Sequence, residues 1–183
     1  TEHLVFVNKP RGMLSHGPGS LEERMRAALA SRAAASLSFS PGPLHRLDRN
    51  TSGLMAFPAT AAGARAVALL QRERRIRKLY VALLDGLLEA PEEWRDRITR
   101  DEASRTSAVS AEGAEALARA SPLLSGAGKS LALVELRTGL THQIRVQASS
   151  RGLPLSGDSK YGGSPLRGGY ILHAAALEFP EPP

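Results

Sequence analysis

Cysteine is absent from this chain of 183 residues, and its absence removes several classes of protein at once. Without cysteine there is no disulfide scaffold, no thiol nucleophile and no thiolate-bound zinc or iron–sulfur site. The five histidines are His3, His16, His45, His142 and His173. No two of them lie three or four residues apart, so a local His-x-x-x-His zinc motif is also missing, and we expect no metal site.

Long apolar runs and aromatic side chains are scarce as well. No stretch is long and apolar enough to span a membrane, and the N-terminus lacks the charged-then-apolar pattern of a secretory signal. The sequence therefore predicts a cytoplasmic protein without membrane contact. With three tyrosines and one tryptophan, the chain offers few platforms for the serial stacking of a long single strand.

Positive charge is what the chain has in surplus. The formal net charge is +6, which favours a polyanionic partner, with nucleic acid the leading candidate. Many basic proteins bind nothing specific, so charge alone leaves both interpretations open. The length favours a single domain over residues 1–183 with a core of its own.

Hydrophobic patterns and turn residues predict a mixture of helices and strands. We expect helices from Ser20 to about residue 37, from Thr60 to about residue 73 and over residues 142–149, with Ser20–Glu23 as a capping box and Thr60 and Thr141 as N-caps. Strands are expected over residues 3–8, from residue 53, and over 78–84, 131–136 and 170–179. The polar, small and weakly periodic residues 91–130 indicate only short strands and loops. Since helices and strands do not alternate regularly, the pattern indicates an α+β fold.

Asp48 is the most informative residue. It lies between Arg46 and Arg49, and positive neighbours favour the ionised carboxylate, which can act as a nucleophile or a base. The ordinary alternative is a turn aspartate whose side chain caps a backbone amide. The two roles do not exclude one another.

Three further segments carry residues suited to binding or chemistry. Tyr80, on the strand that starts at Lys78, offers a flat ring for a nucleobase, although a core tyrosine is the ordinary alternative. His142 and Arg145 follow a Thr-Gly turn, where a helix N-terminus attracts a phosphate and an arginine can pair with a buried aspartate or clamp an anion. The alternative there is a partly solvated helix face. Residues 157–162 are interpreted as a Gly-Asp turn with a packing tyrosine.

These segments resemble, in type and order, the RluA branch of the pseudouridine synthases. Residues 45–54 resemble its His-Arg-Leu-Asp-x-x-Thr-Ser-Gly-Leu motif, residues 78–80 its Lys-x-Tyr strand and residues 138–145 its Thr-Gly-Arg-Thr-His-Gln-Ile-Arg motif. Residues 8–12, 157–162 and 172–174 resemble three further blocks, so the resemblance spans about residues 4–180. It implies a mixed, largely antiparallel sheet flanked by helices and loops.

The resemblance also implies roles for individual residues. Asp48 would be the catalytic nucleophile, Tyr80 would stack on the target base, and Arg145 would pair with Asp48. The family is an isomerase of uridine in RNA; the reaction oxidises nothing and adds no group, so no cofactor is expected. Candidate RNA-binding residues are Arg46, Arg49, Lys78 and His142.

The expected partner is ribosomal or transfer RNA, and the resemblance favours a monomer. Many members of the family carry an S4-type RNA-binding domain, but we expect none within this chain. Leu140 stands where the family motif usually has arginine, which removes a charged donor beside the site. One alternative is a non-catalytic RNA-binding module that keeps the fold. Another is a glycoside hydrolase, which also acts at an anomeric carbon but normally needs two carboxylates, whereas the motif has one.

Overall fold

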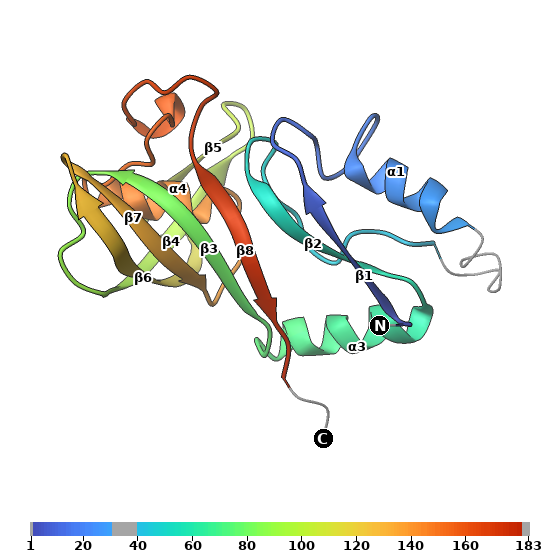
Figure 1. The fold of residues 1–183 in the computed structure, drawn as a ribbon. Coiled ribbons are helices and arrows are strands. Elements are labelled where there is room, and N and C mark those ends of the chain that lie inside the picture. The colour runs from blue at the N-terminus through green and yellow to red at the C-terminus, as the bar shows by residue number, and fades with distance from the viewer. Residues whose placement is uncertain (1, 31–39, 181–183) are drawn as a thin grey trace. The chain divides into compact units, whose positions relative to one another are not determined.

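The computed structural model describes residues 2–30 and 40–180, and backbone contacts divide the chain into two compact units (Figure 1). The first unit holds residues 1–76 and 177–183, and the second holds residues 77–176. A single catalytic domain over residues 1–183 stays a prediction. In the described part of the chain, no helix is long and apolar enough to cross a membrane.

The first unit is built on a pair of antiparallel strands. Strand β1 (Leu4–Lys9) pairs with β2 (Ser52–Pro58), in a register that runs from Leu4 opposite Pro58 to Lys9 opposite Gly53. The helices described in this unit are α1 (Leu21–Ala28) and α3 (Ala61–Arg72). Both strands confirm the sequence prediction.

Both helices described in the first unit begin at the predicted caps. The Ser20 hydroxyl accepts the Glu23 N–H at 3.3 Å, and the Glu23 carboxylate accepts the Gly19 N–H at 2.7 Å. The Thr60 hydroxyl accepts the Gly63 N–H at 3.1 Å. These side chains satisfy donors that the first turn leaves unpaired, so the helix starts were predictable. The predicted continuation of the first helix to about residue 37 falls on residues 31–39, outside the described residues.

The second unit is a sheet with one α-helix and one short 3-10 helix, η1 (Ser159–Tyr161). The strand order is β8-β3-β7-β6-β4-β5. The last two residues of β8 are counted with the first unit. The strands are β3 (Arg77–Asp85), β4 (Glu92–Asp101), β5 (Thr106–Val109), β6 (Ala114–Gly126), β7 (Lys129–Leu136) and β8 (Leu172–Glu178). Helix α4 (Gln143–Ser150) packs on the sheet through Val146, which contacts Ile98 and Ala116. The α+β prediction is confirmed.

The prediction for residues 91–130 was wrong, because β4 has ten residues and β6 has thirteen. Strand β6 does alternate between buried and exposed positions, but its buried positions are Ala116, Ala118 and Ala120, each at most 1% exposed. Alanine adds little to a hydrophobic pattern, so the period of two was hidden in the sequence. The small side chains suit a place where α4 lies close to the sheet.

Candidate active site

Asp48 lies in a loop whose backbone is held in place by hydrogen bonds within the first unit. On one side, the buried Ser15 hydroxyl donates to the Leu47 carbonyl at 2.7 Å and accepts the Leu47 N–H at 3.1 Å. On the other side, the Thr51 N–H donates to the Asp48 carbonyl at 3.1 Å and closes a turn. Asp48 itself is half-buried. The carboxylate therefore projects from a backbone with little freedom to move.

Lys9 ties the same loop to the turn that follows β1. Its side chain is fully buried, and its ammonium donates to the carbonyls of Pro10, Met13 and Arg49 at 3.1, 2.9 and 3.1 Å. Burial lowers the pKa of Lys9 from its ordinary 10.5 to about 8, although the charge of Asp48 partly opposes this. The sequence marked Lys9 only as part of a turn motif. Its role here depends on carbonyls that the fold brings together.

The two arginines beside Asp48 are exposed. The Arg49 Nε donates to the Gly12 carbonyl at 3.0 Å, which ties the loop to the turn after β1. His45, at the start of the same motif, accepts the Ala56 N–H on Nε2 at 3.2 Å and ties the segment to β2. Sequence reasoning assigned no role to His45. The structure makes it an anchor of the Asp48 segment.

Arg145 is held in the second unit by a buried carboxylate. Its Nε and Nη2 donate to Oδ2 and Oδ1 of Asp158 at 2.7 and 2.8 Å. The two side chains are 7% and 2% exposed. The guanidinium carbon also lies 4.8 Å from the Tyr161 ring centre and 4.5 Å from that of Tyr170, both within cation–π range. Asp158 and Tyr161, which the sequence analysis took as structural, thus determine where Arg145 points.

The start of α4 differs from the prediction. The N-cap is His142, not Thr141, and its backbone is left-handed with φ of 58°. No side chain caps the helix; the Gln143 Oε1 instead accepts the Leu140 N–H at 3.0 Å and the Thr138 hydroxyl at 2.9 Å. Thr141 was the wrong choice because Gln143 reaches back and organises the turn. An anion site at this helix end stays a prediction.

His142, the N-cap of α4, and Arg145, on its first turn, both contact the side chain of Tyr161. His142 Nδ1 lies 2.8 Å from the Tyr161 hydroxyl, which also accepts the Ser107 N–H at 2.9 Å. Leu140, in the place of the family arginine, packs against the apolar cluster that contains Val146. A charged side chain would lose that contact.

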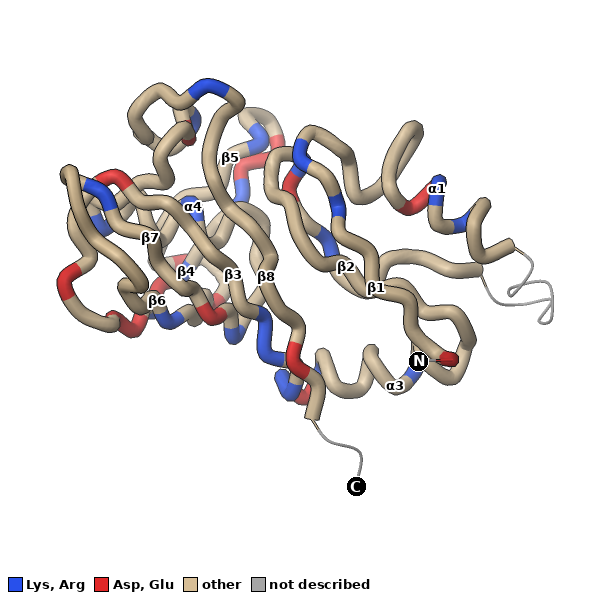
Figure 2. Tube along the Cα trace, viewed as in Figure 1, with Lys and Arg blue, Asp and Glu red and all other residues tan. Residues whose placement is uncertain are grey.

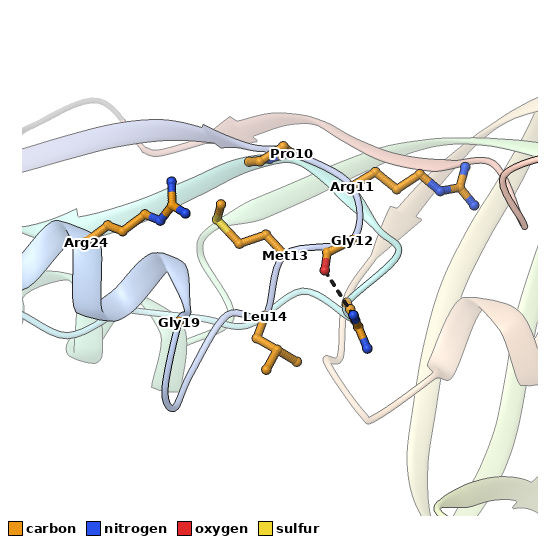
Figure 3. A pocket seen from close by; sticks show the side chains of 8 residues that line it. Pro10, Arg11, Gly12, Met13, Leu14, Gly19 and Arg24 are labelled. Carbon is orange, nitrogen blue, oxygen red and sulfur yellow. Dashed lines mark hydrogen bonds between the residues drawn. The ribbon is translucent and has the colours of Figure 1, made fainter.

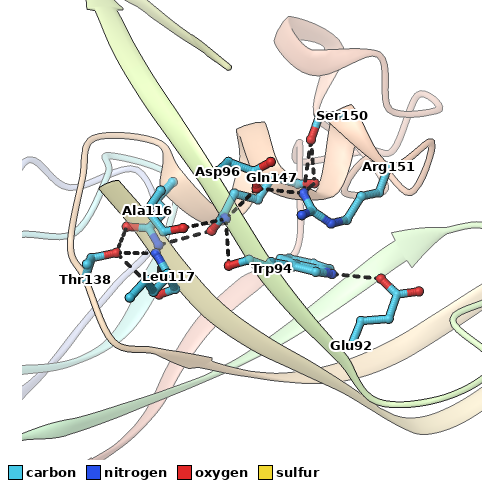
Figure 4. A network of polar contacts seen from close by, with 10 residues as sticks. Glu92, Trp94, Asp96, Ala116, Leu117, Thr138, Gln147, Ser150 and Arg151 are labelled. Carbon is cyan, nitrogen blue, oxygen red and sulfur yellow. Dashed lines mark hydrogen bonds and ion pairs between the residues drawn. The ribbon is translucent and has the colours of Figure 1, made fainter. Parts of the chain in front are cut away.

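Two buried glutamines hold α4 to the sheet, and the sequence analysis missed both. Gln147 Nε2 donates to the Asp96 carboxylate at 2.7 Å and to the carbonyls of Trp94 and Ala116, each at 3.2 Å (Figure 4). Gln143 Nε2 donates to the Leu117 carbonyl at 3.1 Å. The signal in the sequence was a pair of glutamines four residues apart, because this spacing places both on one side of a helix, opposite Arg145.

Tyr80 and Lys78 lie on the same face of β3, since side chains two residues apart point the same way. Tyr80 is 6% exposed, and burial lowers the pKa of Lys78. Arg74 and Arg75 lie in the chain between α3 and β3. Figure 2 shows Lys and Arg positions gathered where α3 is followed by β3. Stacking by Tyr80 and phosphate binding by Lys78 stay predictions.

The predicted residues are therefore distributed over both units. Asp48, Arg46 and Arg49 belong to the first, and the other four belong to the second. The pairing of Asp48 with Arg145 stays a prediction. Among the described residues, no three His, Asp or Glu side chains form a metal site.

Comparison with known proteins gives a consistent result. The family model described as RNA pseudouridylate synthase matches residues 3–150. An uncharacterized RNA pseudouridine synthase of Chloroflexus aurantiacus is 36% identical over 192 residues, which cover 96% of this chain and 58% of that protein. The ribosomal large subunit pseudouridine synthase D of Zymomonas mobilis is 32% identical over 186 residues, covering 97% and 59%.

A solved structure agrees with the sequence matches. Human RNA Pseudouridylate Synthase Domain Containing 1 superimposes with a TM-score of 0.77 at 26% identity, over 98% of this chain and 76% of the other. The chain spans 58% to 63% of the length of three curated relatives.

Proposed function

Since this chain belongs to the RluA branch of the RNA pseudouridylate synthase family, we propose that it isomerises uridine in structured RNA to pseudouridine, with Asp48 as the catalytic carboxylate. The observation that carries the proposal is the Asp48 loop. It holds the one carboxylate of the motif between residues fixed by Ser15 and Lys9. A nucleophile whose backbone is already ordered loses little entropy when the substrate arrives.

The reaction exchanges one bond to the ribose for another. The N1–C1′ bond breaks, the uracil turns while still bound, and C5 joins C1′; the C5 proton leaves and N1 gains a proton. Asp48 starts this sequence either by attacking the ribose or by assisting loss of the C2′ proton. Both routes keep the atoms of the uridine, so the product is an isomer.

The remaining candidate residues act around that step. Arg145, already oriented by Asp158, places positive charge where a carboxylate must stay ionised. Tyr80 stacks on the base, and its hydroxyl helps to remove the C5 proton. A Tyr80→Phe variant with unchanged turnover would leave stacking as its sole role.

Uridine in structured RNA must leave its stack before it can react, which costs a few kcal/mol. Arg46 is exposed and next but one to Asp48, so its guanidinium plane can fill the vacated space. We expect Arg46→Ala to lower both RNA affinity and turnover. Unchanged values for both would remove Arg46 from the mechanism.

Ribosomal RNA is the first substrate to try, because one relative is named a ribosomal large subunit pseudouridine synthase. Transfer RNA is the second. We propose a monomer that needs no cofactor for the isomerisation itself. The cytoplasmic location stays a prediction.

The test is tritium release from RNA labelled at uridine C5, with bulk ribosomal RNA and bulk transfer RNA as separate substrates. Pseudouridine formation expels that hydrogen, whereas mere binding does not. We expect release with the wild type and none with Asp48→Asn. RNA binding without release from either pool would favour the alternative, a non-catalytic RNA-binding module.

A further inference from the structure

A basic hollow of about 510 Å³ opens in the first unit, beside the turn that follows β1 (Figure 3). Three of the residues that line it are arginines from three separate segments, and none is acidic. Arg11 comes from the turn, Arg24 from α1 and Arg49 from the Asp48 loop. Met13 and Leu14 add apolar surface between them.

No carboxylate is among the residues that line the hollow. Two residues beyond Arg24 on α1, Arg26 donates to Glu22 at 2.7 Å. Arg24 is exposed and lines the hollow instead. Glu23, the acidic residue that precedes Arg24 in the sequence, accepts the Gly19 N–H at the start of α1. The hollow is therefore positive and open to an anionic ligand.

The hollow is also firmly coupled to the Asp48 loop. The Gly12 N–H donates to the Arg49 carbonyl at 2.9 Å, and the Arg49 Nε donates to the Gly12 carbonyl at 3.0 Å. These two hydrogen bonds join the wall of the hollow to the residue that follows Asp48. A ligand bound here contacts Arg49, in the loop that carries Asp48.

We propose that this hollow binds the RNA backbone next to the target nucleotide, with Arg11 and Arg24 contacting phosphates and Met13 and Leu14 packing on a sugar or base. The inference rests on the proposed function and adds two residues that the motifs did not mark. In Figure 3, Arg11 and Arg24 extend from opposite sides of Met13 and do not converge on one point. That spacing suits successive phosphates of one strand better than a single small anion.

The experiment measures binding of a fluorescein-labelled RNA hairpin with a uridine-rich loop, over salt concentrations from about 50 to about 200 mM. The variants are Arg11→Gln and Arg24→Gln. Arg65→Gln is the matched control, because Arg65 is an exposed arginine on α3 that does not line the hollow. Circular dichroism and the unfolding midpoint establish that all variants are folded.

Each lost phosphate contact should reduce the slope of log K against log salt by about 0.7 to 0.9 and weaken binding about fivefold near physiological salt. We expect this for Arg11→Gln and Arg24→Gln, with the control unchanged. Slopes equal to the wild type would overturn the proposal, and so would an equal loss in all three variants, which would indicate unspecific charge.

The outcome is separable from that of the proposed function. If the wild type releases no tritium but the two hollow variants lose slope, the isomerase proposal fails and the RNA site stands. If tritium is released and the hollow variants bind like the wild type, the isomerase stands and this site falls.

Discussion

Replacing Asp158 by Asn tests the buried ion pair that orients Arg145. The change keeps the volume of the side chain and removes its charge. The carboxylate accepts two N–H groups of Arg145 at 2.7 and 2.8 Å, but an amide has only one oxygen and turns its NH₂ toward a donor. A guanidinium that is 7% exposed then loses the charge of its buried partner Asp158.

The expected cost follows from that burial. Removing one partner of a buried pair typically destabilises a protein by about 3–5 kcal/mol, because the remaining charge stays desolvated. The rings of Tyr161 and Tyr170 still face the guanidinium and offset a part of this, so we expect about 3 kcal/mol. An exposed pair costs much less, and Glu102→Gln is the matched control, since Glu102 pairs with Arg100 while 78% exposed.

The assay is urea unfolding followed by tryptophan fluorescence. Trp94 is the one tryptophan of the chain and is fully buried in the same unit as Asp158, so its emission reports on the unit that the mutation affects. A double variant with Arg145→Met and Asp158→Leu should regain most of the stability, because no buried charge is left unpaired. It should not regain turnover if Arg145 pairs with Asp48 as proposed.

The reasoning is refuted if Asp158→Asn costs less than about 1 kcal/mol and so matches the exposed Glu102→Gln control. It is refuted as well if the apolar double variant is less stable than Asp158→Asn.

Three further predictions concern other polar side chains. Burial lowers the pKa of Lys9 from 10.5 to about 8, so between these pH values the unfolded chain binds more protons than the folded one, and stability rises with pH. In urea unfolding, the free energy of unfolding of the wild type should therefore rise by about 2 kcal/mol relative to Lys9→Met between about pH 7 and about pH 9.5. Burial alone would raise the pKa of Asp85, but hydrogen bonds from Lys129 and two serines outweigh it and lower the pKa, so this stabilisation is complete above 3.8 and fades below it. Acid unfolding should therefore be less steep in Asp85→Asn than in the wild type. Gln147→Leu removes a donor from two buried carbonyls and should lower the free energy of unfolding by about 1–3 kcal/mol.

Helix starts show how far local sequence can be trusted. Thr60 and Thr141 are both threonines before a helical pattern, and only Thr60 is a cap. At Thr60 the cap needs nothing beyond the next three residues. At Thr141 the Gln143 side chain is pinned to the Leu117 carbonyl on β6, and it satisfies the turn that a threonine would have capped. A contact between distant segments overrode the local signal.

Strands show the same division. Residues 78–84 were predictable because large apolar side chains alternate there, and β3 covers them. Strand β6 was not predictable, because its buried face is alanine and becomes informative only when α4 lies against the sheet. Hydrophobic periodicity reports burial through side-chain size, so it fails where close packing demands small residues.

The sequence by itself determined the α+β class, the helix caps at Ser20 and Thr60, and the family through its ordered motifs, since each depends on residues close together in the chain. Tertiary structure alone decided that the buried Lys9 donates to the carbonyl of Arg49, forty residues away, and that Arg145 is held by Asp158. A buried charge is tolerated only where the folded chain supplies its partners. Those partners come from segments whose meeting no local pattern records.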